Sequence, residues 1–120
     1  MTDTWKITET SFDPQRQRHF ETVLTQGNGY LGTRGTFDEY YPGEQRTTFV
    51  HGVFDDVPVV FTHLVNFPAW TQLDITLAGE DFSLAEGKLL DYHRELDLKT
   101  GLLTRTLRWQ SPKGRISKLD

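Results

Sequence analysis

Short segments of β-branched and aromatic residues, separated by Gly, Pro, Asp and Asn, recur along the whole of this 120-residue chain. Such segments with turns at close spacing are typical of an all-β domain, because antiparallel strands need only a few residues and short connections. The pattern predicts an antiparallel β-sandwich. The expected strands are residues 5–12, 19–26, 47–54, 59–67, 73–78, 81–84, 90–98, 102–109 and 115–120.

Turn-forming residues mark the connections between these strands. The expected turns are Asp55-Asp56, Gly79-Glu80, the loop Lys99-Thr100-Gly101, and residues 111–114. Residues 59–67 read as a largely buried strand, since apolar side chains dominate them. The last expected strand runs to the chain end with no partner, which would leave an open sheet edge. We therefore expect the sequence to be part of a longer protein.

Residues 19–26 fit two structures. Phe20, Val23 and Leu24 would form one face of a helix, whereas Phe20, Thr22 and Leu24 would form one face of a strand. The Gly-Asn-Gly that follows is a hairpin signal with Tyr30-Leu31 as the return strand, and this favours a strand. The polar residues 15–19 before it are expected to form a turn with some helical character.

Composition excludes several classes of function. The net charge is −4, from 13 basic and 17 acidic residues, which argues against nucleic acid or an anionic membrane as the main partner. There is no cysteine, so a disulfide framework and a thiolate metal site are both excluded. The apolar run at 57–61 is too short to span a bilayer, and the N-terminus lacks the apolar core of a signal peptide. A cytoplasmic protein is expected.

The stretch QGNGYLGTRG at residues 26–35 places four glycines within ten residues. It lacks the Lys of a P-loop, and although Gly27, Gly29 and Gly32 match Gly-x-Gly-x-x-Gly, the residues after them are poor helix formers. A flexible linker would leave Tyr30 and Leu31 exposed. We therefore expect a hairpin turn in which Gly32 and Gly35 allow close packing or a bulge, with Arg34 paired to a carboxylate.

No catalytic constellation stands out among the remaining side chains. The acidic pairs at 38–39, 55–56 and 80–81 are expected in solvated turns, and the tryptophans in the core. The serines have no Gly-x-Ser-x-Gly context. The four histidines lack the spacing of a metal-binding helix, so surface or hydrogen-bonded roles are expected. They are His19, His51, His63 and His93.

Several motifs in order resemble one known family. QGNGYLGTRGTFDE resembles the signature near the start of glycoside hydrolase family 65, which comprises the maltose, trehalose and kojibiose phosphorylases and related hydrolases. TFVHGVFDDVP, LVNFPAW, LDLKTGLL and TLRW follow at residues 48–58, 64–70, 96–103 and 106–109, in the order and rough spacing of that family's N-terminal domain. The resemblance covers about residues 12–114, nearly the whole chain.

The resemblance implies that residues 1–120 are an incomplete part of a galactose-mutarotase-like supersandwich, followed in the parent enzyme by a helical linker and an (α/α)6 barrel. It implies that a glutamic acid of the barrel protonates the glycosidic oxygen while inorganic phosphate attacks with inversion. A hydrolytic relative would need a second carboxylate to activate water. Implied partners are a disaccharide, phosphate as co-substrate, the barrel and a second subunit. No cofactor, metal or catalytic residue is expected in this segment.

Exposed polar and aromatic residues near the glycines and in the Tyr-Tyr-Pro-Gly turn are the candidates for contact with substrate or with another domain. They are Asn28, Tyr30, Arg34, Tyr40 and Tyr41. The expected role is scaffolding: packing on the barrel, shaping the active-site entrance and contributing to dimer contacts. Two alternatives remain, a free-standing carbohydrate-binding sandwich and a purely structural module that self-associates through its unpaired edge.

Overall fold

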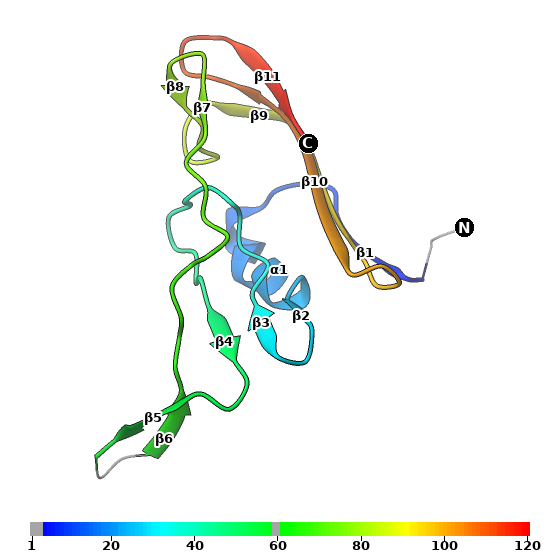
Figure 1. Cartoon of the computed structure of the whole chain (residues 1–120). Coiled ribbons are helices and arrows are strands. Elements are labelled where there is room, and N and C mark those ends of the chain that lie inside the picture. The colour runs from blue at the N-terminus through cyan, green and yellow to red at the C-terminus, as the bar shows by residue number, and fades with distance from the viewer. Residues whose placement is uncertain (1–3, 59–60) are drawn as a thin grey trace.

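The computed structural model describes residues 4–58 and 61–120. Antiparallel strands dominate, with one short helix, and form a four-stranded sheet, a three-stranded sheet and two two-stranded hairpins (Figure 1). The predicted all-β class with antiparallel pairing is confirmed. The elements are β1 Lys6–Glu9, η1 Pro14–Arg16, α1 Gln17–Val23, β2 Gln26–Gly27, β3 Leu31–Thr33, β4 Thr48–Val50, β5 Phe54–Val57, β6 Phe61–Leu64, β7 Thr76–Leu77, β8 Glu80–Asp81, β9 Lys88–Asp97, β10 Leu102–Gln110 and β11 Ile116–Leu119.

The four-stranded sheet is the main framework and has the order β1-β9-β10-β11. Its long hairpin β9–β10 pairs Asp97 with Leu102, so the loop has four residues, 98–101, one more than predicted, and its Gly101 has φ +68°. Glycine adopts this left-handed conformation without steric cost. The pairing shifts between Arg108 and Trp109, which is a β-bulge. The predicted hairpin and the final strand β11 are both confirmed, but β11 pairs antiparallel with β10, so the expectation that the last strand has no partner is wrong.

The loop of this hairpin holds a carboxylate in its charged form. Asp97 Oδ1 accepts the backbone N–H groups of Lys99 at 2.8 Å and of Thr100 at 3.3 Å. The hydrogen bond from Lys99 is the largest cause that places the pKa of Asp97 below its ordinary value. Because the folded pKa is the lower one, this stabilisation is complete above the unfolded pKa and is lost as the pH falls through the folded pKa.

We expect the Asp97 carboxyl to titrate at a lower pH in the folded chain than in the same chain unfolded in urea, as carboxyl-carbon NMR would measure. Replacement by Asn removes the charge. When the pH is lowered below about 4, carboxyl groups gain protons. Over this range the free energy of unfolding of Asp97→Asn should therefore fall less than that of the wild type. Titration curves that coincide in the folded and unfolded chains would contradict this expectation.

The strand predicted at residues 19–26 is wrong, because most of that segment lies in helix α1. The Asp13 side chain accepts the backbone N–H of Gln15 at 2.9 Å, and Pro14 begins the preceding turn. Phe20 and Leu24, four residues apart, are buried on the same helix face and pack with Leu96 of β9. The main sheet thus supplies the apolar surface that selects the helical alternative, while the predicted helical character before residue 20 is confirmed.

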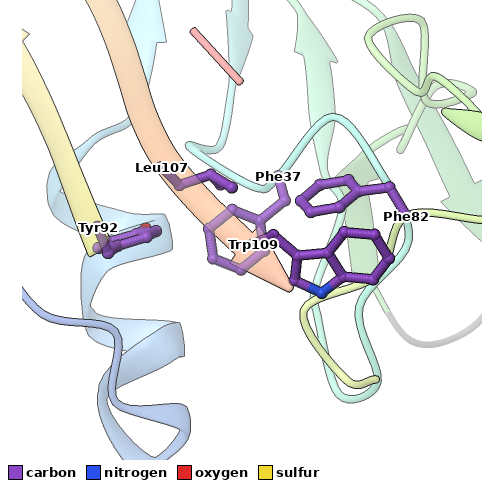
Figure 2. Close-up of a cluster of buried hydrophobic side chains, with 5 residues drawn as sticks. All are labelled: Phe37, Phe82, Tyr92, Leu107 and Trp109. Carbon is purple, nitrogen blue, oxygen red and sulfur yellow. The ribbon is translucent and has the colours of Figure 1, made fainter. Parts of the chain in front are cut away.

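The larger hydrophobic core lies against β9 and β10. Figure 2 shows Phe37 and Phe82, which come from loop segments, close to Trp109 of β10. The rings of Phe82 and Trp109 meet edge to face with their centroids 5.2 Å apart. Trp109 Nε1 donates to the carbonyl of Glu86 at 2.8 Å, so the indole is both buried and hydrogen-bonded. The buried members of this cluster are Phe37, Phe82, Tyr92, Leu107 and Trp109.

The prediction that all the tryptophans lie in the core is wrong for two of the three. Trp109 is 1% exposed, whereas Trp5 and Trp70 are 51% and 63% exposed. Alternation along a long central strand places Trp109 inward. Trp70 lies in a loop outside the strands, where no such alternation applies.

The hairpin β5–β6 projects as an arm from the rest of the chain (Figure 1). The strand predicted at residues 47–54 ends at Val50, and the predicted turn Asp55-Asp56 instead lies within β5. Of the expected buried strand 59–67, residues 59 and 60 lie outside the described part. Phe61 and Leu64 of β6 are exposed, because within residues 4–58 and 61–120 the two strands of the arm pair only with each other and no second layer covers them.

The predicted hairpin around residue 79 is confirmed with its turn moved by one residue. Thr76 pairs with Asp81 and Leu77 with Glu80, so the turn residues are Ala78 and Gly79. Both have positive φ, +51° and +80°, as in the turns that suit the twist of a two-residue hairpin.

No helix in the described ranges 4–58 and 61–120 is long and apolar enough to cross a membrane.

Candidate functional site around the glycine-rich hairpin

The glycine-rich stretch forms the predicted hairpin, which joins β2 to β3. Gln26 pairs with Thr33 and Gly27 with Gly32. Asn28 Oδ1 accepts the backbone N–H groups of Tyr30 at 3.0 Å and of Leu31 at 2.9 Å. Gly29 has φ +85°, which its lack of a side chain allows. Asn28 thus stabilises the turn through its carbonyl oxygen, while its side-chain NH2 group has no hydrogen-bond partner among the described residues.

Gly35 is where the chain after β3 comes closest to helix α1. A Cβ atom at this position would lie 2.6 Å from Leu24 Cβ and 2.7 Å from the Leu24 carbonyl oxygen. The N–H of Gly35 donates to the carbonyl of Glu21 at 2.9 Å. Close packing is therefore confirmed at Gly35. At Gly32 the nearest atom to such a Cβ would be 3.8 Å away, so no close approach requires glycine there.

Arg34 is paired with a carboxylate, as predicted. Its Nη2 lies 3.4 Å from Glu21 Oε2 and donates to the carbonyl of Arg18 at 3.2 Å. Glu21 is 1% exposed and also accepts the backbone N–H of Gln45 at 3.2 Å and the side-chain amide of Gln17 at 3.1 Å. The Arg34 side chain thus fastens the hairpin to α1.

The tyrosine candidates differ in exposure. Tyr30 at the hairpin and Tyr40 are 66% and 61% exposed. Tyr41 is half-buried, with its ring centroid 5.2 Å from that of Phe12 and 5.9 Å from that of Phe37, both edge to face. Tyr41 therefore packs on the larger core, while Tyr30 and Tyr40 remain available for contact.

The structure does not gather the five candidates into one cavity. Asn28 lines a cavity beside Trp70, Arg34 lines one with Thr25 and Phe49, and Tyr40 lines a third with Asp74 and Asp81. A contact role for each of them stays a prediction.

Two ion pairs, each with a buried carboxylate, fix the segment that follows the hairpin. Arg94 Nη2 lies 2.9 Å from Glu9 Oε2, and Arg105 Nη2 lies 2.6 Å from Glu39 Oε2. Both guanidinium groups face the ring of Phe37, at 4.8 Å for Arg94 and 5.0 Å for Arg105. The main sheet thereby holds this segment from two adjacent strands, with cations against an aromatic ring.

Burial and pairing act on the titratable groups of this network. Desolvation, the largest cause, raises the pKa of Tyr92, whose hydroxyl donates to Glu9 Oε2 at 2.8 Å. For Arg105, burial alone would lower the pKa, but the bidentate hydrogen bonds and charge of Glu39 outweigh it and the pKa is raised. These groups keep fixed charge states near neutral pH, which suits a structural network rather than proton transfer.

Sequence reasoning missed this network. Glu39 and Glu80 are 2% and 9% exposed, so the expectation of solvated acidic pairs is wrong for these two residues. Arg94 alternates with the apolar Tyr92 and Leu96 along β9, and this period of two was the signal that an inward-facing cation needed a buried acid. Asp55 and Asp56 are exposed, as expected, although within a strand.

The described residues include no group of three or more His, Asp or Glu side chains that could hold a metal ion. His19, His51 and His93 are exposed and His63 is half-buried. His93 Nε2 lies 3.5 Å from Glu95 Oε2.

The match to known proteins covers nearly the whole chain. Residues 7–120 match the family model described as Glycosyl hydrolase family 65, N-terminal domain. The chain belongs to this family. The resemblance drawn from the glycine-rich signature and the motifs after it is thereby confirmed.

Relatives of this family 65 domain include named phosphorylases. Kojibiose phosphorylase of Halothermothrix orenii is 43% identical over 115 residues, which are 96% of this chain and 15% of that protein. Alpha,alpha-trehalose phosphorylase of Thermoanaerobacter brockii is 34% identical over 127 residues, covering 93% of this chain and 16% of that protein. A solved structure from the human microbiome, provisionally named a kojibiose phosphorylase, has a TM-score of 0.82 at 29% identity and covers 94% of this chain and 17% of its own. The chain thus spans about 15% of the length of the first of these relatives.

Proposed function

We propose that this family 65 domain is the N-terminal part of an enzyme that cleaves an α-glucosidic disaccharide with inorganic phosphate. The observation that carries the proposal is the match of residues 7–120 to the family, together with phosphorylases among the relatives that share this segment. In those relatives the matched segment is a small share of the protein, so most of each enzyme lies outside it. In the proposed enzyme a barrel outside residues 1–120 supplies the general acid.

The proposed role of the domain is scaffolding, with contacts to the catalytic barrel at the active-site entrance and to a second subunit. Large apolar side chains exposed on the projecting arm and on β4 support such contacts, because burying them against another protein surface removes apolar area from water. They include Phe49 at 37%, Phe54 at 58%, Phe61 at 62% and Leu64 at 39% exposure. The balanced charge and absence of cysteine fit a cytoplasmic enzyme.

A chimera tests this proposal. Residues 1–120 would replace the matching segment of the Halothermothrix orenii kojibiose phosphorylase, to which they are 43% identical. We expect phosphate-dependent release of glucose 1-phosphate from kojibiose within about tenfold of the parent rate, equivalent to about 1.4 kcal/mol of transition-state free energy. The isolated 120-residue chain should release none from maltose, trehalose or kojibiose.

Two controls make the chimera informative. The relative without its matching segment should be inactive, which shows that the segment is needed. A chimera carrying an unrelated β-sandwich of similar length should also be inactive. A soluble chimera with this chain that is as inactive as the unrelated one would count against the proposal, as would turnover by the isolated chain.

A further inference from the structure

A cavity beside the glycine-rich hairpin contains the most exposed tryptophan of the described residues. Its volume is about 300 Å³, and Trp70 in its wall is 63% exposed. Small-molecule sites begin at about this volume. The lining residues are Gln26, Gly27, Asn28, Leu31, Thr33, Trp70 and Thr71.

The loop that carries Trp70 is held at both ends. The N–H of Phe67 donates to the carbonyl of Thr48 at 2.9 Å, and the N–H of Leu73 donates to the carbonyl of Asp38 at 2.8 Å. Within the same loop, Asn66 Oδ1 accepts the N–H of Thr48 at 3.0 Å. A wall anchored in this way needs little ordering when a ligand binds, which favours affinity.

The lining of the cavity is mostly apolar, with a few uncharged polar groups. It contains two side-chain amides and two hydroxyl groups beside the indole, and no Asp, Glu, Lys, Arg or His. The carbonyl oxygen of Asn28 is used within the hairpin, so its NH2 group is left as a donor. The NH2 group of Gln26 donates to the carbonyl of Gly101, so its carbonyl oxygen is left as an acceptor.

These features fit a neutral sugar ring. An aromatic face packs against the C–H groups of a pyranose, while an amide donor and an amide acceptor pair with its hydroxyl groups. A phosphate group would instead need a cation or clustered backbone N–H groups. We propose that the cavity between the β2–β3 hairpin and Trp70 binds a neutral glucosyl unit, with Trp70 as the stacking platform. The choice of glucose among sugars rests on the proposed function.

Titration of the 120-residue chain with maltose tests this site. We expect saturable shifts of the Trp70 indole N–H and of the backbone N–H signals of residues 26–33 in ¹H–¹⁵N NMR spectra. Trp70→Ala should weaken binding by at least about tenfold, since loss of an aromatic contact has an effect of that order. Trp70→Phe should retain part of the affinity. Glucose 1-phosphate should bind more weakly than maltose.

Trp5→Ala is the matched control, because Trp5 is also exposed, at 51%, and lies in a different part of the fold. It should leave the affinity unchanged within about twofold, a difference that is small against the tenfold loss. Thermal unfolding of each variant verifies that it is folded. The absence of saturable shifts, equal effects of Trp5→Ala and Trp70→Ala, or stronger binding of glucose 1-phosphate would each overturn the proposal.

A further outcome would assign the cavity to a protein contact instead. If maltose causes no shift and the chain forms dimers that Trp70→Ala dissociates, the cavity is an interface between copies and the sugar-binding proposal is wrong. The titration involves no catalytic barrel, so its failure would leave the chimera result standing. An inactive chimera would likewise leave maltose binding by this chain measurable.

Discussion

Replacing Arg94 by methionine should destabilise the domain by about 3–5 kcal/mol, because it leaves a buried carboxylate without its cation. Arg94 and Glu9 are each 2% exposed. Glu9 Oε2 accepts Arg94 Nε at 3.0 Å and lies 2.9 Å from Nη2. Arg94 Nη1 also donates to the carbonyl of Gly35 at 2.9 Å, so the variant loses one of the links between the main sheet and the hairpin segment. Urea unfolding at neutral pH would measure the loss.

An exposed ion pair on the same sheet provides the control for this prediction. Arg108 Nη1 lies 3.0 Å from Asp91 Oδ2, and these side chains are 50% and 63% exposed. Arg108→Met should cost less than about 1 kcal/mol, since water already screens such a pair. Combining Glu9→Leu with Arg94→Met should recover part of the stability, because no unpaired charge then remains inside. Equal losses in the Arg94 and Arg108 variants would show that Glu9 is not effectively buried.

Substituting alanine for Gly35 should cost about 1–3 kcal/mol, the range for an atom forced into a packed interior. The added methyl would lie 2.6 Å from Leu24 Cβ and 2.7 Å from the Leu24 carbonyl oxygen. Leu24 is 0% exposed and belongs to the core cluster of α1, so it has little room to move. The clash includes backbone, and a side-chain rotation alone does not relieve it.

Gly32→Ala is the matched control, because Gly32 lies in the same glycine-rich stretch and only Thr33 and Arg34 separate it from Gly35. Its added methyl would be 3.8 Å from the nearest atom, the carbonyl oxygen of Gln26, which is an ordinary contact. We expect its free energy of unfolding to stay within about 1 kcal/mol of the wild type, since alanine also restricts the unfolded chain. A larger loss at Gly32 than at Gly35 would contradict the close approach to helix α1.

Patterns of neighbouring residues predicted the structure correctly where those residues alone decide the backbone conformation. The hairpin at Asn28-Gly29 and the loop ending at Gly101 were predicted because few residues adopt positive φ readily. The strands around that loop followed from β-branched and apolar alternation. The family resemblance was likewise readable, because it depends on the order of motifs and not on their three-dimensional contacts.

Such patterns gave wrong predictions where contact with residues far away in the sequence decides the conformation or the burial of a segment. Residues 19–26 carried apolar positions that suited both a helix and a strand, and the partner Leu96, more than seventy positions along the chain, selected the helix. The apolar strand β6 appeared suited to burial, yet it lies on an arm with no second layer. The contact role of the five candidate residues stays a prediction, and Trp70 was wrongly expected in the core because its neighbours in space were unknown.

The sequence by itself determined the all-β class, the main turns and the membership of family 65, since each depends on residues close together in the chain or on their order. Only the tertiary structure decided the helix, the pairing of Arg94 with the buried Glu9 and of Arg105 with the buried Glu39, and the exposure of Trp70 beside the hairpin. These features join positions far apart in sequence, so their energies appear only when the chain is folded.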